Sequence, residues 1–154
     1  TDAIIAWVTN IALFADQAKA TGNELVVLPW SDAGLELYSS SVVASEAFLK
    51  ERPDVAKRFL RAFDKSLKFT SENPRKAAEA LNTMVPEVDA DVATAQIGDT
   101  MNLVVNDVSE RDGLGALTEE RVALTWDWVA QAEKLSGDAL DPEAVVDRTL
   151  FEAL

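Results

Sequence analysis

The chain of 154 residues contains no cysteine and no histidine. Without cysteine it has no disulfide, no thiolate nucleophile and no cysteine-based metal site. Without histidine it lacks the side chain that most often performs general acid–base catalysis near neutral pH. The composition therefore argues against an enzyme, and we expect neither a bound metal nor a cofactor.

Two short motifs that would change this expectation are incomplete. Residues 89–99 superficially match a calcium loop, but they have no glycine at the sixth position, and no acidic residue stands at the twelfth. Gly113 and Gly115 are not followed by Lys and Ser or Thr, and no strand leads into them, so no phosphate-binding loop is predicted. Neither a cation nor a nucleotide is expected to bind.

Positive charge is scarce as well, with 14 Lys and Arg against 27 Asp and Glu and a net charge of −13. Nucleic acids and anionic lipid surfaces are bound by clustered cations, so this balance argues against both as partners. No apolar run reaches the length of a membrane-spanning helix, and we expect no stable membrane insertion. The excess of acid is explained most simply by solubility.

Apolar residues make up 48% of the chain, which predicts a folded domain, or one lobe with a piece of another. Residues 2–7, "DAIIAW", and 24–30, "ELVVLPW", are predicted to be buried strands around a helix that begins after Thr9 or Asn10 and ends before Gly22. This order is typical of parallel strands in an α/β sheet. A third strand is predicted within residues 36–45.

From Ser45 onward the pattern is almost entirely helical. Helix starts are predicted at Ser45, Pro53, Asn73-Pro74, Asp89, Thr118 and Asp141-Pro142. Apolar stripes are predicted to face the core, namely Val55, Phe59, Phe63 and Leu67; Ala93, Ile97, Met101 and Val104; and Val122, Trp126 and Val129. Residues 108–118 are predicted to break the helices, and Gly137 is predicted to close the one that starts at Thr118. Three strands are few for a complete sheet, and Thr1 follows no basic and apolar leader, so we expect a start inside a longer structure.

Between the second and third predicted strands the chain reads "PWSDAG", residues 29–34, instead of a plain tight turn. Gly34 has the backbone freedom that a hinge needs. Trp30, Ser31 and Asp32 follow the end of a strand, which is where ligands bind in open α/β sheets. An aromatic face beside a carboxylate and a hydroxyl suits a small ring-bearing or amine-bearing ligand. The alternatives are a packing role for Trp30 and a local turn formed by Asp32.

The order of these features resembles one family of periplasmic substrate-binding proteins of ABC importers, the alkanesulfonate, taurine, nitrate and thiamine-pyrimidine-precursor group. The resemblance is carried by Asp2-Ala3, by "WSDAGLELYSS" (30–40), by "VVASEAFLKERPDVAKRFLRAF" (42–63) and by "ENPRKAAEAL" (72–81). Trp126 and the closing "DPEAVVDRTLFEAL" (141–154) are also similar.

The resemblance implies an α/β fold of the type II periplasmic-binding-protein kind, here a helix-rich C-terminal part with few strands. Residues 1–31 would be the tail of the second lobe, 32–34 the interlobe crossover, and 35–154 the C-terminal part of the first lobe. Ligand contacts would come from Trp7, Asn10, Trp30, Ser31, Asp32 and Tyr38, with Ala33 and Gly34 as the hinge. For Trp7, Asn10 and Tyr38 the alternatives are core packing, helix capping and cover of the sheet.

The function that follows is capture of a small solute in an interlobe cleft and its delivery to an ABC permease in the inner membrane. The location would be the periplasm, or the cell surface with a lipid anchor in a Gram-positive-type cell. A sulfonate, a pyrimidine and an aromatic acid all remain open as ligands. The alternatives are a pyrimidine-precursor synthase on the same scaffold, which uses histidine and pyridoxal phosphate, and a helical interaction domain without a small ligand. The charges of residues 52–65 are interpreted as a solvated helix face, or as part of a surface that docks on the permease.

Overall fold

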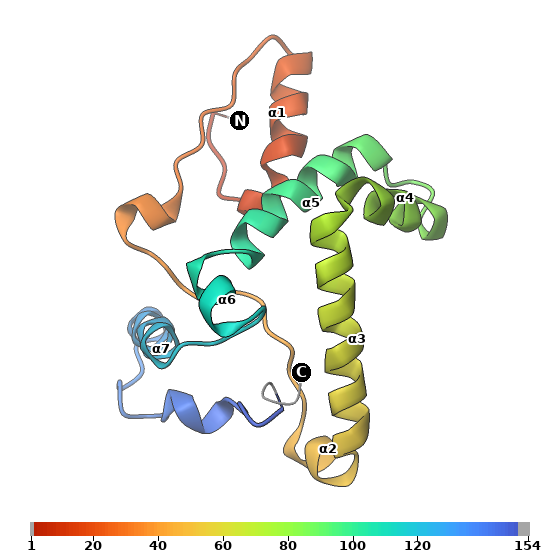
Figure 1. Ribbon diagram of the computed structural model, residues 1–154. Coiled ribbons are helices and arrows are strands. Elements are labelled where there is room, and N and C mark those ends of the chain that lie inside the picture. The colour runs from red at the N-terminus through yellow and green to blue at the C-terminus, as the bar shows by residue number, and fades with distance from the viewer. Residues whose placement is uncertain (1, 151–154) are drawn as a thin grey trace. The chain divides into compact units, whose positions relative to one another are not determined.

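The computed structural model describes residues 2–150, and helices dominate this part of the chain (Figure 1). In chain order the elements are the 3-10 helix η1 (Val8–Asn10), α1 (Ile11–Ala20), the 3-10 helix η2 (Trp30–Ala33), α2 (Glu46–Glu51), α3 (Pro53–Glu72), α4 (Pro74–Met84), α5 (Ala90–Val104), α6 (Asp107–Asp112), α7 (Glu119–Glu133) and the 3-10 helix η3 (Pro142–Val145). The prediction of a helix-rich chain is confirmed.

The chain divides into two compact units. The first comprises Thr1–Pro29 and Lys65–Leu114, and the second comprises Trp30–Asp64 and Gly115–Leu154. Helix α3 contributes its first part to the second unit and its last part to the first. The division into lobes at residues 32–34 stays a prediction, and each unit is described here by itself.

The first unit is built around α5, against which α4, α1 and η1 pack. Ala78 of α4 and Ala93 of α5 are buried, and small side chains allow two helix backbones to approach closely. On the predicted face of α5, Ala93 is buried and Ile97, Met101 and Val104 are half-buried. Helix α5 starts after Asp89, close to the predicted position, and the Asp89 carboxylate caps it by accepting hydrogen bonds from the amides of Asp91 (2.8 Å) and Val92 (3.0 Å).

The second unit contains α2, the start of α3, α7 and η3, with long irregular segments between them. Ser45 caps α2 through a bond from the Phe48 amide (3.2 Å), and Thr118 caps α7 through a bond from the Arg121 amide (3.4 Å), both as predicted. Helix α7 packs against η3. The indole nitrogen of Trp126 donates to the Gly137 carbonyl at 2.7 Å, which holds the end of the connecting loop.

The predicted strands are wrong for the residues that the structure describes, because residues 2–7, 24–29 and 35–45 are irregular and no strand is formed. Several of their apolar side chains point to water instead of a core: Ile5, Leu28 and Val43 are 85%, 86% and 88% exposed. A strand needs a neighbour to pair its N–H and C=O groups, and none of the described segments provides one. The sequence marked the strand-forming residues but not the partner that they need.

The expected break at residues 108–118 is partly wrong, because the short helix α6 extends over its first residues, to Asp112. Asn106 and Ser109 form a capping box: the Asn106 side chain accepts from the Ser109 amide (3.2 Å), and Ser109 Oγ accepts from the Asn106 amide (2.8 Å). Helix α6 ends at Gly113, whose φ of 98° is left-handed. The capping box is sufficient to start α6, and Gly113 ends the helix instead of preventing it.

Three further expectations about helix ends need correction. Asn73 does not cap α4, because its side chain donates backward to the Phe69 carbonyl at 3.2 Å. Helix α7 ends at Glu133 with Lys134 in the left-handed region, before Gly137 is reached. The last predicted helix is only the single turn η3, after which the Asp147 side chain accepts a hydrogen bond from the Thr149 amide at 3.0 Å and favours a turn. Residues 151–154 of that prediction lie outside the described residues.

Two of the stripes predicted to face a core are partly exposed in the described residues. Phe59 and Phe63 of α3 stack on each other with ring centroids 6.0 Å apart, yet both are exposed. Val129 of α7 is exposed as well. The only fully buried positions among residues 2–150 are four alanines, at 56, 78, 93 and 130.

Candidate functional site

The segment predicted as a crossover forms one turn of 3-10 helix, η2, closed by a glycine. The Leu35 amide donates to the Trp30 carbonyl at 3.0 Å, and the Gly34 amide donates to the Ser31 carbonyl at 2.9 Å. Gly34 has φ 87°, a conformation that residues with a side chain rarely adopt. The turn is therefore closed by backbone bonds, and the Asp32 carboxylate is not used to make it.

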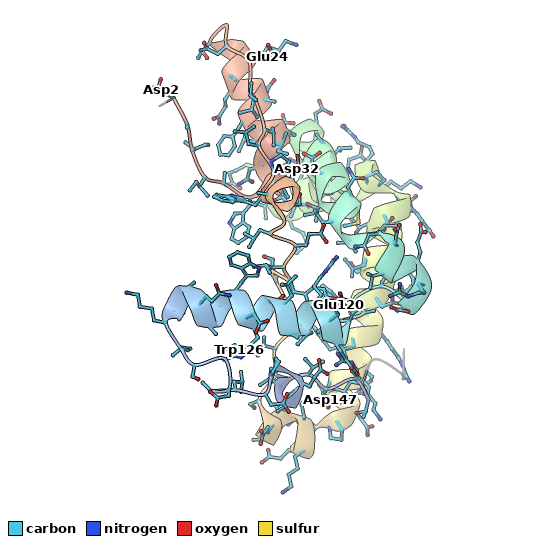
Figure 2. All side chains as sticks on the ribbon, turned by 90° about the vertical axis from the view of Figure 1, so that its left-hand side faces the viewer. Asp2, Glu24, Asp32, Glu120, Trp126 and Asp147 are labelled. Carbon is cyan, nitrogen blue, oxygen red and sulfur yellow. The ribbon has the colours of Figure 1, made fainter. Side chains whose placement is uncertain are left out.

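Trp30, Ser31 and Asp32 are all presented to solvent by this turn. Trp30 is 59% exposed, and Ser31 and Asp32 are exposed too. Figure 2 shows Asp32 on the small helical turn η2. A large exposed aromatic ring next to a free carboxylate and a hydroxyl is a combination that can stack on and orient a small molecule.

Tyr38, the next predicted ligand residue, is instead engaged with the N-terminus of α7. Its hydroxyl oxygen accepts a hydrogen bond from the Thr118 amide at 2.8 Å, and the hydroxyl lies 3.4 Å from the Ala116 carbonyl oxygen. The Tyr38 amide donates to Thr125 Oγ1 at 3.1 Å. Both polar ends of Tyr38 are thus committed to fixing the segment after η2 onto α7.

Arg121 completes this cluster from the next turn of α7. Its guanidinium lies 5.7 Å from the centroid of the Tyr38 ring, and it forms an ion pair with Glu36 at 3.1 Å. The cation therefore interacts with the ring face and with the carboxylate two residues earlier in the chain. We call Glu36, Tyr38, Thr118, Arg121 and Thr125 the Tyr38 anchor.

The sequence analysis missed the partners in this anchor. Thr118 was identified only as a helix cap, and Arg121 and Thr125 were not singled out. A signal was present, because residues 118, 121 and 125 recur at helical spacing and place three polar side chains on one face of α7. Polar residues on a helix face usually indicate solvent, which is why their link to Tyr38 could not be recognised.

Trp7 and Asn10 belong to the first unit, where Trp7 precedes η1 and Asn10 is its last residue. Trp7 is 69% exposed, and its carbonyl accepts a hydrogen bond from the Asn10 amide at 2.9 Å. Asn10 occupies the cap position of α1, but its side chain makes no capping bond. Its oxygen instead lies 3.5 Å from Nε2 of Gln96 on α5.

Asp99 stands one turn beyond Gln96 on the same helix, and sequence reasoning did not single it out. One of its carboxylate oxygens is shielded from solvent without a hydrogen-bond partner among the described residues. A shielded and unpaired carboxylate oxygen is costly, and such groups are often completed by a ligand, a water or another segment. The amide of Gln96 and this carboxylate are two polar groups on α5, the first of them close to Asn10.

The predicted site residues therefore fall into two groups. Trp7 and Asn10 lie in the first unit, whereas Trp30, Ser31, Asp32 and Tyr38 lie in the second together with the hinge residues Ala33 and Gly34. A pocket formed by both groups stays a prediction. Within residues 2–150, no group of three or more carboxylates is arranged to hold a metal ion.

The clearest pKa changes lie at helix ends and turns, away from the candidate site. Hydrogen bonds from the Val92 and Asp91 amides lower the pKa of Asp89 below its usual value. The Arg111 guanidinium lowers the pKa of Asp112 in the same way, and the Ser136 hydroxyl lowers that of Asp138. These shifts arise from hydrogen bonding and ion pairing at the surface.

Comparison with known families gives the context for these residues. The sequence model of the family described as "NMT1/THI5 like" matches residues 1–77, which is half of the chain. The chain belongs to the NMT1/THI5-like family. This is a family of substrate-binding proteins, mostly binding proteins although it includes a synthase, and its members are typically secreted or periplasmic.

The matched region of this NMT1/THI5-like chain contains every predicted ligand residue, from Trp7 to Tyr38. No curated protein and no solved structure matches the chain. None of the described helices has the length and apolar character needed to cross a membrane.

Proposed function

We propose that the chain is part of the solute-binding component of an ABC importer, which captures a small molecule in an interlobe cleft and delivers it to a membrane permease. The observation that carries the proposal is the match of a substrate-binding family to residues 1–77, the stretch that presents Trp7, Trp30 and Asp32 to solvent. Under this proposal the protein works in the periplasm, or at the cell surface on a lipid anchor.

The chemistry of η2 supports a flat solute with at least one polar group. Exposed indole rings offer a stacking surface, and the Asp32 carboxylate is free to accept hydrogen bonds from an amine or ring N–H group. Asn10, whose side chain caps no helix, adds an amide that can both donate and accept. We therefore propose a ring-bearing solute such as a pyrimidine or an aromatic acid ahead of a simple sulfonate.

Closure of the cleft supplies the mechanism. A solute that contacts both lobes favours the closed over the open arrangement by its differential affinity for the two states. Gly34 follows η2 directly, and no heavy atom lies within 4 Å of the position that a side chain would occupy there. Because glycine has no side chain, it can adopt the range of φ and ψ values that a hinge requires. The Tyr38 anchor would fix the segment that follows this hinge to α7.

The exposed extended segments support a larger fold around the described one. Residues 2–7, 24–29 and 35–45 have the composition of strands, and several of their apolar side chains are largely exposed. In the proposed type II two-lobe fold these segments pair with further strands of the same protein. Their exposed apolar residues would then become the core of two sheets covered by helices.

The test is a thermal-unfolding screen of the full-length protein against small sulfonates, pyrimidines and aromatic acids. A ligand at about 100 times its Kd should stabilise the protein by about 2.7 kcal/mol and raise the midpoint by several degrees. Trp30→Ala and Asp32→Asn should abolish the shift. Trp128→Ala, a partly exposed tryptophan on α7, is the matched control and should retain it.

The results separate the proposed function from its rivals. A panel in which no compound raises the midpoint would exclude solute capture. Loss of the shift in Trp128→Ala but not in Trp30→Ala would move the site away from η2. The synthase alternative would reveal itself by the visible absorbance of a pyridoxal phosphate aldimine, which a binding protein does not show.

A further inference from the structure

The end of α6 carries a chemically reactive pair of residues, Asp112 and Gly113. Asp112 is the one Asp or Asn of the whole sequence that is followed by Gly. Asp-Gly pairs react readily because glycine has no side chain to hinder its amide nitrogen when this nitrogen attacks the preceding carboxyl group. The attack closes a succinimide ring. Asp112 is exposed, so water can reach a ring formed there.

The reaction needs no partner other than water. The Gly113 nitrogen forms a bond to Cγ of Asp112, and one carboxyl oxygen leaves as water with the acid proton and the amide proton. Water then opens the ring at either of its two carbonyl groups. Opening at Cγ restores aspartate, whereas opening at the main-chain carbonyl gives isoaspartate, in which the backbone runs through Cγ. Isoaspartate therefore adds one CH2 group to the backbone and frees the former main-chain carboxylate.

The contacts at the end of α6 oppose this reaction in two ways. The Gly113 amide donates to the Ser109 carbonyl at 3.0 Å, so its nitrogen is not available to the Asp112 side chain. The Asp112 carboxylate accepts hydrogen bonds from Arg111 at 2.9 and 2.6 Å. These bonds lower the pKa of Asp112, and only the neutral carboxyl group loses its oxygen readily. Both reacting groups are held in unreactive states while α6 is formed.

Helix α6 is a weak restraint because it is short and exposed. It comprises six residues, Asp107–Asp112, and none of them is buried. A helix of this length is not stable in isolation, so α6 depends on the capping box of Asn106 and Ser109 and on its surroundings. Local opening of such a segment needs much less free energy than unfolding of the whole chain. Each opening releases the Gly113 amide and the Asp112 carboxyl group together.

We propose that Asp112-Gly113 is the principal site at which this chain forms isoaspartate, and that α6 controls the rate by opening and closing. The other aspartates lack the following glycine. Asp138, for example, lies in an exposed segment, but it is followed by Ala139, whose methyl group hinders attack by its amide nitrogen. This modification goes beyond solute capture and does not depend on it.

The product changes the backbone close to the point where the chain passes from one unit to the other. The first unit ends at Leu114 and the second resumes at Gly115, two residues beyond the reactive bond. The added CH2 group moves the Gly113 amide away from the Ser109 carbonyl, so α6 loses the hydrogen bond at its end. Isoaspartate should therefore open α6 and make the reaction irreversible in structural as well as chemical terms.

The test is incubation of the 154-residue chain at mildly acidic pH, followed by peptide mapping with liquid chromatography and mass spectrometry. Isoaspartate has the mass of aspartate but a different retention time, and the succinimide is lighter by one water molecule. We expect both products at Asp112 and neither at the exposed Asp138, the internal control. The rate at Asp112 should rise when the chain is unfolded in guanidinium. Equal modification of Asp138, or none of Asp112 in the unfolded chain, would overturn the proposal.

A cap substitution tests the control by α6. Asn106→Ala removes the acceptor of the capping box and should raise the rate about five-fold, the change in helix population expected for the loss of one cap. Ser45→Ala removes the matching cap of α2 and should leave the rate unchanged. In guanidinium the Asn106→Ala and unsubstituted chains should react equally, because α6 is absent from both. Equal rates in the folded state would show that α6 does not restrain the reaction.

An arginine substitution tests the ion pair separately. Arg111→Gln should raise the rate by about two-fold to five-fold, since an exposed ion pair contributes only modestly. Arg148→Gln is the matched control, because Arg148 forms a similar ion pair with Glu143 at 2.9 Å, and it should leave the rate unchanged. An equal rise in the two variants, or a rise in neither, would contradict the role assigned to Arg111.

Discussion

Each of the two units is stabilised internally by a different kind of interaction. In the first, α4, α1 and η1 pack on α5, and small buried residues such as Ala78 and Ala93 let the helices approach. In the second, much of the chain is irregular, and the Tyr38 anchor fixes it through individual hydrogen bonds and one ion pair. Helix packing spreads stability over many contacts, whereas the anchor concentrates it in a few polar groups. The candidate ligand residues Trp30 and Asp32 lie in the unit held by the anchor.

The largest effect is expected at the interface between α4 and α5. Ala78 is 0% exposed, so Ala78→Asp places an unpaired carboxylate among packed helices and should cost about 3–5 kcal/mol of unfolding free energy. Ala80→Asp, an exposed position on the same helix, should cost much less. Urea unfolding followed by far-UV circular dichroism measures both. Equal costs would show that helix packing does not hold the first unit.

An intermediate effect is expected at the Tyr38 anchor. Tyr38→Phe keeps the ring under Arg121 but removes the acceptor of the Thr118 amide, which should cost about 1–2 kcal/mol. Hydrogen exchange should speed up at the start of α7 and stay unchanged in α4 and α5. If α4 and α5 lost protection equally, the two units would open as one, and the contrast between them would disappear.

The smallest effect concerns the charge that caps α5. Because the folded pKa of Asp89 is lowered, its contribution to stability is complete above the unfolded pKa of about 3.9 and is lost as pH falls through the lower folded value. Asp89→Asn keeps an oxygen that can cap but cannot titrate. The variant should be slightly less stable at neutral pH, and the difference should vanish in acid. Thermal unfolding at several pH values follows this, and a constant difference would assign the effect to geometry instead of charge.

The sequence predicts features that depend on neighbouring residues better than features that depend on distant ones. The starts of α2 and α7 were predicted from their caps, because a cap and the amides it bonds lie within four residues of each other, and the start of α3 was predicted from Pro53. The helix α6 was missed because two glycines drew attention away from its capping box. Capping residues can be recognised in the sequence, but a nearby glycine can lead to the wrong prediction.

Interactions between distant residues were not predicted. The hydrogen bond from the Thr118 amide to Tyr38 joins residues 80 apart in the chain, and no local pattern announces it. The strands failed for a related reason, since residues 24–29 have the composition of a strand but a strand exists only with a partner. The exposed turn at Trp30–Gly34 was located correctly as a break between apolar runs, and the pocket beside it stays a prediction.

The distribution of cations has a practical consequence for probing the crossover. No lysine or arginine occurs between Lys19 and Lys50, so trypsin cannot cut the stretch that holds η2 and the residues around it, however accessible they are. Chymotrypsin prefers aromatic residues, and Trp30 offers such a site in an exposed turn. Digestion by the two proteases in parallel would report separately on α3 and on the crossover, and protection of the Trp30 bond by a small molecule would provide a label-free assay of occupancy.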